Sequence, residues 1–424
     1  MKATSLALDH LLRAAGDPIA DLNHIGPGHA EFDLAQIIRA GVGVLAKSPD
    51  AFPAIAQAIR PVGGLLLSPA MRAHHAAAEA WLSGNPVLAA ERYEAILKQW
   101  PRDVLALRLT QSCYFFLGWH ERFCTILDEV IPAWMPDAEG LDFVLAMASF
   151  AHAENGNAAY AEVLGRKALA KDPACPVGVH AVAHAMAESG RPLEGAQWMR
   201  AQRAHWAGDS RMRTHNAWHL AMFDVEEGNI APALNILDAW LLPASTLSSI
   251  EACDAAALLW RLATEGVDVA SRWCAVSDAF EQTLSPGFWP YVDLHAALAH
   301  IAAGKPARSK ALTDAIERCA QGSNYAASRA RHITLPGFQA LHAWAEGRYG
   351  EAAKLLRALQ PLLPYAGGSR VQLEIFKSIE RKSGNLGRTA QHHQPRKTLP
   401  KIPAMREASA GRVSLRFEPS PIGH

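Results

Sequence analysis

The sequence has few cysteines, no net charge and no long apolar run. Its 424 residues include 41 basic and 41 acidic side chains, which balance. A formal charge of zero argues against a partner held by bulk electrostatics, so we expect neither nucleic acid nor a membrane surface as a partner. No uncharged stretch is long enough to span a membrane, and segment 1–18 lacks the apolar core of a signal peptide. We therefore expect a soluble, cytoplasmic protein.

The cysteines are too scattered for a disulfide framework or a cysteine-based zinc site, both of which need closer spacing. We expect reduced and mostly buried thiols at these positions: Cys113, Cys124, Cys175, Cys253, Cys274 and Cys319. A period-two alternation of polar and apolar residues is also missing over any useful length, which argues against strands.

The sequence does contain glycines at near-regular intervals of 34 to 43 residues, each after an apolar, alanine-rich segment. A left-handed glycine commonly ends a helix, and a second amphipathic segment follows each of these glycines. The pattern predicts helix–turn–helix units stacked in order. The turn glycines are Gly84, Gly118, Gly156, Gly190, Gly228, Gly266, Gly304, Gly347 and Gly384.

These units resemble the tetratricopeptide repeat. Small residues recur near the start of the second helices, at Ala90, Ala196, Ala233 and Ala353, and Pro101 and Pro173 stop two of these helices. We predict an all-α fold, a superhelical α-solenoid of stacked hairpins over residues 28–384. Residues 1–27 are expected to form a helix and a loop. The basic, proline-containing segment 385–424 is expected to be a disordered tail.

Two histidine pairs stand near the middle of this array. His180 and His184 are four residues apart, as are His215 and His219. At that spacing each pair projects from one face of its helix.

Several phrases are similar, in the same order, to those of the tetratricopeptide repeat protein 38 family. They are His180-Ala-Val-Ala-His184, His215-Asn-Ala-Trp-His219-Leu-Ala, Asp254-Ala-Ala-Ala-Leu-Leu-Trp260-Arg261-Leu, Asp293-Leu-His295-Ala and Gly367-Gly368-Ser369. The resemblance spans roughly residues 28–376. The chain departs from it at Ala217, where the family commonly has a second tryptophan, and at Gln372-Leu373-Glu374. The resemblance implies a fold and a set of positions, and no activity.

Polar residues recur at a similar place in the first helices, which line the concave face of such solenoids. They lie 9 to 12 residues before a turn glycine and comprise His75, Arg108, His180, His219, Asp254, Asp293, His295 and Glu374. This column predicts a His- and Asp-rich groove. Its few lysines argue against a lysine-rich clamp for a peptide carboxyl terminus.

Three interpretations of the histidines stay open. They could bind a divalent metal through His180, His184, His215 and His219, although Ala181 replaces the glutamate that a zincin motif requires. They could perform acid–base chemistry through His219 or His295, with Asp254 or Asp293 orienting the ring. They could also be buried packing residues, which is the interpretation that the sequence favours over each of the others.

We predict a binding or scaffold protein whose groove holds a peptide or a small ligand, with an enzyme that uses the same groove as the alternative. The predicted ligand-binding residues are His180, His184, His215, Trp218, Arg261 and Ser369. The sequence names no cofactor, and a divalent metal is open but not favoured. For Ser369, capping of the next helix is a commoner role than binding an anion.

Overall fold

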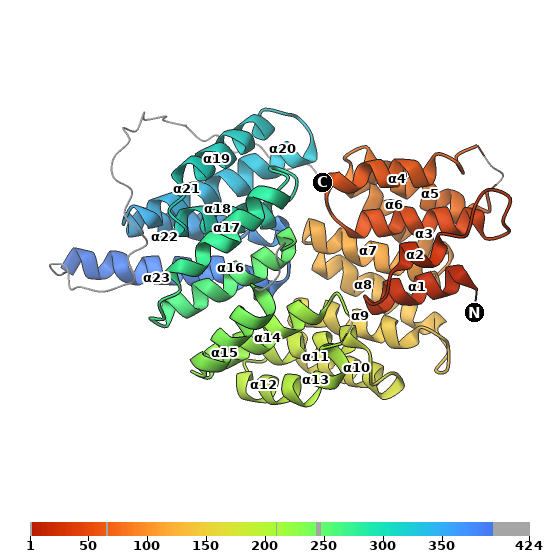
Figure 1. The fold of residues 1–424 in the computed structure, drawn as a ribbon, viewed down its shortest axis with the longest axis horizontal. Coiled ribbons are helices and arrows are strands. Elements are labelled where there is room, and N and C mark those ends of the chain that lie inside the picture. The colour runs from red at the N-terminus through yellow and green to blue at the C-terminus, as the bar shows by residue number, and fades with distance from the viewer. Residues whose placement is uncertain (1, 65–66, 209, 243–246, 393–424) are drawn as a thin grey trace.

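The computed structural model describes residues 2–64, 67–208, 210–242 and 247–392 (Figure 1). Within these ranges the chain is helical and forms no β-strand, although Ala15 and Ser210 make an isolated antiparallel bridge. The predicted fold class, an all-α solenoid of tetratricopeptide-like hairpins, is confirmed.

The helices follow one another as antiparallel pairs with short connections. They are α1 (Ala3–Arg13), α2 (Pro18–Leu22), α3 (Phe32–Leu45), α4 (Phe52–Ile59), α5 (Pro69–Leu82), α6 (Pro86–Gln99), α7 (Val104–Leu117), α8 (His120–Val130), α9 (Leu141–Glu154), α10 (Ala158–Lys171), α11 (Pro176–Glu188) and α12 (Pro192–Ala201). The second half contains α13 (Arg203–Trp206), α14 (Arg213–Glu226), α15 (Ile230–Ile236), α16 (Ser249–Thr264), α17 (Trp273–Thr283), α18 (Pro290–Ala302), α19 (Pro306–Ala320), α20 (Tyr325–Arg329), α21 (Leu335–Ala345), α22 (Tyr349–Leu359) and α23 (Arg370–His392).

The predicted turn glycines end the first helix of each pair in all cases but one. Positive φ angles between 64° and 84° occur at Gly84, Gly118, Gly156, Gly190, Gly228, Gly266, Gly304 and Gly347. Gly384 instead lies inside α23, so the prediction of a turn there is wrong. The small residues of the second helices are buried at close helix contacts, as Ala90 and Ala233, both 0 % exposed, illustrate.

Both ends of the chain differ from the prediction. The N-terminal segment forms two helices, α1 and α2, rather than one, and both pack against α3. The backbone N–H of Arg211 donates to Ala14 O at 2.7 Å, so this segment also contacts the middle of the chain. At the other end α23 continues to His392, past the predicted start of the tail at 385. The rest of the predicted tail, 393–424, lies outside the described residues.

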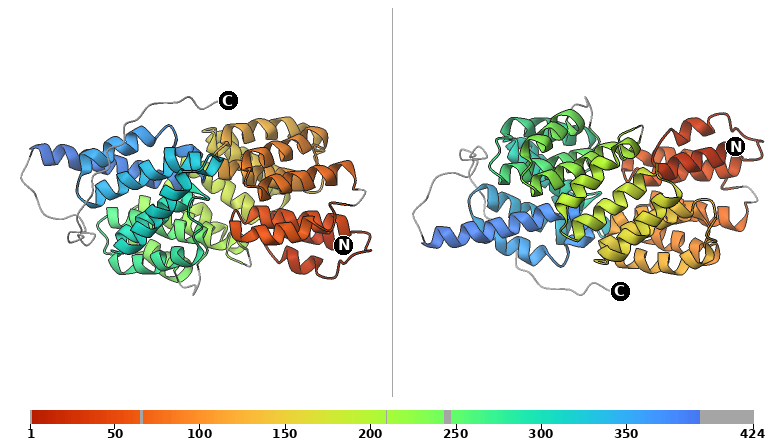
Figure 2. Two further views of the ribbon diagram at one scale, coloured as in Figure 1. Left: turned by 90° about the horizontal axis from the view of Figure 1, so that it is seen from above. Right: turned by 90° about the horizontal axis from the view of Figure 1, so that it is seen from below.

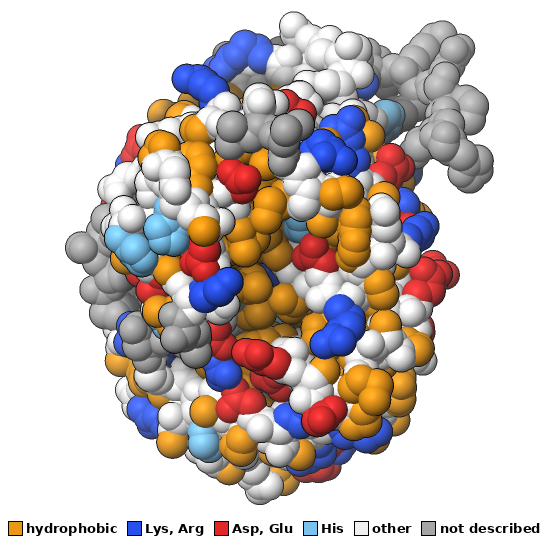
Figure 3. Space-filling model, turned by 90° about the vertical axis from the view of Figure 1, so that its right-hand side faces the viewer, with side chains coloured by type: hydrophobic (Ala, Val, Ile, Leu, Met, Phe, Trp, Pro, Cys, Tyr) orange, Lys and Arg blue, Asp and Glu red, His pale blue; other side chains and the backbone are white. Residues whose placement is uncertain are grey.

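The helix pairs follow an arc that brings late units against early ones. Helices α1–α6 and α19–α23 occupy opposite ends of the long axis, and α10–α15 connect them along one side (Figures 1 and 2). The end face in Figure 3 is hollowed at its centre, with mostly hydrophobic side chains inside and charges of both signs around the rim.

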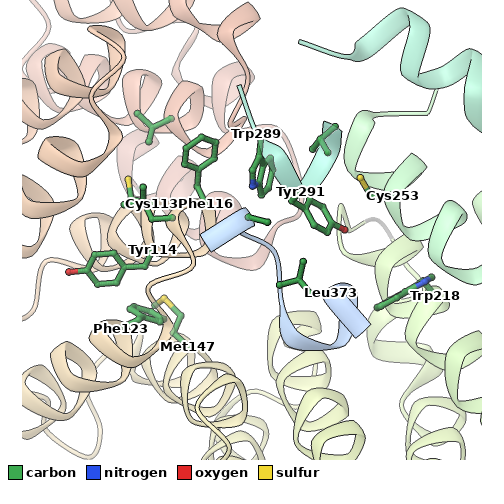
Figure 4. Packing of buried hydrophobic residues seen from close by; sticks show 14 of the residues in the cluster. Cys113, Tyr114, Phe116, Phe123, Met147, Trp218, Cys253, Trp289, Tyr291 and Leu373 are labelled. Atoms are coloured by element: carbon green, nitrogen blue, oxygen red, sulfur yellow. The ribbon is translucent and has the colours of Figure 1, made fainter. Parts of the chain in front are cut away.

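The arc closes where the segment before α23 meets α7. The backbone N–H of Gly368 donates to Phe115 O at 3.2 Å, and a side chain at Gly118 would come within 1.9 Å of Pro364 O. Aromatic side chains fill the space beside this contact, with the Phe116 and Trp289 rings 5.4 Å apart (Figure 4). The centre of the superhelix is therefore packed at this level rather than an open groove.

The inner helices are buried on almost every side. In α9, for example, all residues from Phe143 to Glu154 are buried. A helix enclosed in this way is expected to be apolar all round, so each polar side chain that it carries needs a partner inside the protein.

Candidate metal centre

Four histidine rings meet between α11 and α14. His180 and His184 come from α11, and His215 and His219 come from α14. Each offers one ring nitrogen, and these four atoms lie within 4.8 Å of one another. Helical spacing puts each pair on one face, and the packing of α11 on α14 brings the two faces together. The structure thus joins the two pairs that the sequence singled out.

Two aromatic side chains enclose the histidine cluster. Phe150 of α9 stacks on the His180 ring with centroids 5.7 Å apart and meets the His184 ring edge-on at 4.9 Å. Trp218 of α14 stacks on His215 at 5.2 Å and meets His219 edge-on at 4.8 Å. These rings limit the rotation of the imidazoles and lower the local dielectric around their nitrogens.

Two carboxylates orient one histidine from each helix. The Nδ1 atom of His184 lies 3.0 Å from Glu154 Oε1, and Nδ1 of His215 lies 2.7 Å from Asp254 Oδ2. A carboxylate accepts this bond, so Nδ1 carries the hydrogen and Nε2 presents a lone pair. The same carboxylate–histidine arrangement orients the ligands of protein metal sites.

The Nε2 atoms point into the cluster. Those of His180 and His215 are 3.1 Å apart. Those of His184 and His219 are buried without a hydrogen-bond partner among the described residues. A buried nitrogen without a partner is costly, so an acceptor of lone pairs at this point would stabilise the cluster.

Burial keeps three of the imidazoles neutral. It lowers the pKa of His180 and His219 well below the usual histidine value, and the neighbouring rings add to this effect. It also lowers the pKa of His184, against the opposing effect of the hydrogen bond to Glu154. Burial raises the pKa of Glu154, but the His184 hydrogen bond and the nearby histidine charges bring it below its usual value overall. Neutral imidazoles beside an ionised carboxylate are the form that binds a metal ion.

The first turn of α23 holds both carboxylates in place. The backbone N–H of Arg370 donates to Glu154 Oε2 at 2.6 Å, and Gln372 Nε2 donates to Asp254 Oδ1 at 3.1 Å. Ser369 Oγ accepts from the backbone N–H of Gln372 at 3.2 Å, while Gln372 Oε1 accepts from that of Ser369 at 3.1 Å. Ser369 therefore caps α23 and positions the side chain that reaches Asp254.

Three predicted site residues lie apart from the cluster. Both oxygens of Asp293 accept from the backbone N–H of Gly287 at 3.2 Å. His295 donates from Nδ1 to Tyr291 O at 2.7 Å and packs on Phe376. Arg261 forms an ion pair with Glu226 at 3.5 Å. Asp293 therefore holds a loop, and among the described residues no hydrogen bond joins it to a histidine of the cluster.

Sequence reasoning missed Glu154, Phe150, Arg370 and Gln372. Glu154 belongs to the phrase that ends α9, and such a position before a turn glycine ordinarily faces solvent. Its burial follows from the return of the segment before α23 to the middle of the chain. No local pattern carries that information.

A second cluster joins Cys124, Asp128 and His152. The Cys124 Sγ lies 3.0 Å from His152 Nδ1, and His152 Nε2 lies 3.2 Å from Asp128 Oδ1. Burial and the Asp128 charge raise the pKa of the Cys124 thiol to about 11. The thiol is therefore protonated near pH 7, which is the unreactive form. The expectation of mostly buried thiols holds for four positions, while Cys274 is exposed and Cys319 is half-buried.

A pocket of about 510 Å³ lies against the other face of α14. Ala217, Leu220 and Asp224 contribute to it, and helical periodicity places them opposite His215 and His219. The remaining walls come from α12, α13 and α15 with the segment after it. The pocket and the histidine cluster thus share one helix but open on different sides.

The fold defines a tetratricopeptide-like helical-repeat protein. No protein-family model matches the sequence. Solved structures of similar fold include the APC/C hetero-tetramer Cut9–Hcn1, at 12% identity over 89% of this chain and 68% of that chain, with a TM-score of 0.43. A Rap protein in complex with Competence and Sporulation Factor matches at 12% identity over 91% and 100% of the two chains, with a TM-score of 0.41. The human IFIT1 dimer with m7Gppp-AAAA matches at 13% identity over 92% and 87%, with a TM-score of 0.45. At these levels the likeness carries no argument about function.

Among the described residues, no helix combines the length and the apolar character that crossing a membrane requires.

Proposed function

We propose that this protein binds one divalent first-row transition-metal ion through His180, His184, His215 and His219. The main observation in support is that four ring nitrogens lie within 4.8 Å of one another. Buried carboxylates orient two of the rings so that Nε2 faces the others. Imidazole ligands favour zinc, copper, nickel, cobalt or iron, whereas magnesium and calcium prefer oxygen ligands.

This proposal accounts for the cluster better than packing alone does. A packing histidine normally satisfies both ring nitrogens, yet Nε2 of His184 and His219 lack partners among the described residues. A metal ion would be a common partner for both atoms. It would also explain why the chain places two buried carboxylates behind the rings, where they add ligand basicity.

An oxygen atom of a small ligand would join the four imidazoles as a fifth ligand, and the ion would act on it as a Lewis acid. A small ligand suits the site better than a peptide, since Phe116 and Trp289 pack across the centre of the superhelix. The acid–base alternative has less support, because Asp254 contacts His215 rather than the proposed base His219.

Elemental analysis of the purified, untagged protein tests this proposal. We expect about one metal ion per chain, and loss of that ion in a His180→Ala/His219→Ala double variant that retains its helical circular dichroism. The matched control is His24→Ala/His29→Ala, because both of these rings are exposed and lie 6.3 Å apart. A wild-type protein that arrives without metal and takes up neither Zn²⁺ nor Co²⁺ in calorimetry would refute the metal centre.

We further propose that the chain belongs to the tetratricopeptide repeat protein 38 family, works in the cytoplasm and combines an N-terminal extension, a solenoid and a basic tail. The quoted phrases around both histidine pairs support the family, and the lack of a long apolar run supports the compartment. Fractionation of cells that express the full chain tests the location. Proteolysis with mass spectrometry tests the boundaries near residues 27 and 384.

A further inference from the structure

One face of α7 looks toward the histidine cluster. Arg108, Gln111 and Phe115 share this face, and Arg108 Nη1 donates to Gln111 Oε1 at 3.0 Å. The Phe115 ring lies 6.3 Å from Phe150, which in turn stacks on His180. Phe150 therefore lies between Phe115 and the proposed metal centre.

Three basic side chains around this face have no acidic partner. Lys47 Nζ donates to Leu45 O at 3.0 Å, and Arg211 donates to Gly16 O at 2.8 Å. Arg108 has only its bond to the neutral Gln111. Among the described residues, no carboxylate comes within ion-pair distance of any of the three, whereas Arg122 pairs with Glu94 at 2.7 Å.

These charges act on one another and on the cluster. Burial lowers the pKa of Arg108 to about 10, with a contribution from the charge of Arg211. Burial and the charge of Arg108 lower the pKa of Lys47 to about 7. The charge of Arg108 also contributes to the low pKa of His180. An uncompensated cation in such a place is destabilising unless an anion joins it.

We propose that the ligand of this site carries an oxyanion group, a carboxylate or a phosphate, held between Arg108 and the metal ion. This inference rests on the proposed metal centre, since one oxygen of the group would contact the ion. A guanidinium suits the second contact, because its planar fork can donate two parallel hydrogen bonds to a carboxylate or phosphate.

The charge balance of the site agrees with an anionic ligand. The four imidazoles add no charge when they bind a metal, and the carboxylates of Glu154 and Asp254 offset a divalent ion. Arg108 then remains uncompensated, and the charge of Arg211 adds to the positive potential beside it. A neutral or cationic ligand would not compensate this positive potential.

The test uses full-length protein loaded with Co²⁺, whose visible spectrum changes when an anion joins the metal. Inorganic phosphate and succinate are the two probes, so the two sources of the oxyanion are distinguished. We expect one-to-one binding of at least one probe with a spectral change, weakened ten-fold or more in Arg108→Gln. The matched control, Arg102→Gln, alters an exposed arginine just before α7 and should bind as wild type does.

Arg108→Lys provides a second variant, which retains the charge without the fork and should bind with intermediate affinity. It decides the case if Arg108→Gln does not fold. Metal content is measured first on the same samples. Protein without metal contradicts the proposed function. Metal-loaded protein that ignores both probes, or that binds them equally well in Arg108→Gln, overturns the oxyanion inference alone.

Discussion

The Nε2 atoms of His180 and His215 lie 3.1 Å apart, although 35 residues separate them in the chain. Neighbouring nitrogens around a tetrahedral zinc ion are separated by roughly 3.3 Å, given zinc–nitrogen bonds of about 2.0 Å. The packing of α11 on α14 therefore sets two rings at the spacing of metal ligands. Because His215 Nδ1 faces Asp254, its Nε2 is the lone-pair side of the ring.

The first prediction concerns Glu154→Gln. The amide keeps the size of the side chain but can offer its NH₂ group to His184 Nδ1, so the orientation of the ring hydrogen is no longer enforced. We expect metal affinity to fall by about 10- to 100-fold, as is typical when the hydrogen-bond partner of a ligand is altered. Competition with a zinc-binding dye measures the effect.

Glu162→Gln is the control for this variant, because Glu162 pairs with Arg166 and Arg191 on the outer surface. Equal metal affinity in wild type and Glu154→Gln would show that the carboxylate does not orient the His184 ring for metal binding.

The second prediction concerns acid stability. Burial lowers the pKa of His295 from 6.5 to about 4, so the unfolded chain takes up a proton at this residue at a higher pH than the folded protein. The contribution of neutral His295 to the free energy of unfolding is therefore fully present above pH 6.5 and is lost as the pH falls toward 4. This one residue accounts for a loss of roughly 3 kcal/mol by pH 4.

Urea unfolding at pH 7 and pH 5 measures this dependence. His295→Gln, which can still donate to Tyr291 O, should make stability less dependent on pH. His24→Gln, at an exposed ring, should leave the dependence unchanged. An identical pH dependence in wild type and His295→Gln would contradict the assignment.

The third prediction separates the closure of the arc from the turn geometry. Gly84 and Gly118 share a φ of 75°, but a side chain meets nothing within 4 Å at Gly84 and lies 1.9 Å from Pro364 O at Gly118. Gly84→Ala should cost about 1 kcal/mol of stability from the backbone conformation alone. Gly118→Ala should cost about 2 kcal/mol more, because the last unit must shift away from α7.

Chemical denaturation of both glycine variants gives this difference directly. Gly118→Ala should also weaken metal binding, since the displaced segment includes Arg370 and Gln372. Equal destabilisation by the two substitutions would show that the contact at Pro364 adds nothing.

The fourth prediction concerns thiol reactivity. Cys124 contacts His152 in an arrangement that could activate a nucleophile, yet its thiol pKa is raised to about 11. We expect slow reaction with a disulfide reagent at pH 7.5, while the exposed Cys274 reacts promptly. Mass spectrometry of labelled peptides over time distinguishes the two sites, and fast labelling of Cys124 would contradict the protonated thiol.

Helix geometry explains which parts of the site could be predicted from the sequence. The spacing of His180 and His184 is local, so an α-helix alone puts both rings on one face. The turn glycines predict the order of the hairpins for the same reason. The same reasoning does not settle where Asp293 points. Each residue turns the helix by about 100°, so Asp293 and His295 point in directions more than half a turn apart, and an error of two residues in the assumed register exchanges the two faces.

The carboxylate partners of the histidines could not be predicted, because they depend on the curvature of the whole array and not on any short segment. Glu154 is buried because the segment before α23 returns to α9, and that return is the sum of small rotations between successive helix pairs. Gln372 reaches Asp254 for the same reason, although 118 residues separate them in the sequence. A prediction that treats each helix pair separately does not include these accumulated rotations.

The contacts of Arg370 and Gln372 also impose an order on biosynthesis. A nascent chain that has just released α14 from the ribosome already contains all four imidazoles, yet lacks Asp254 and the two groups that hold Glu154 and Asp254 in place. Those groups arrive with the final hairpin, and N-terminal segments fold first during translation. The proposed metal centre is therefore completed in the last folding step of the whole array, and a chain that lacks α23 cannot complete it.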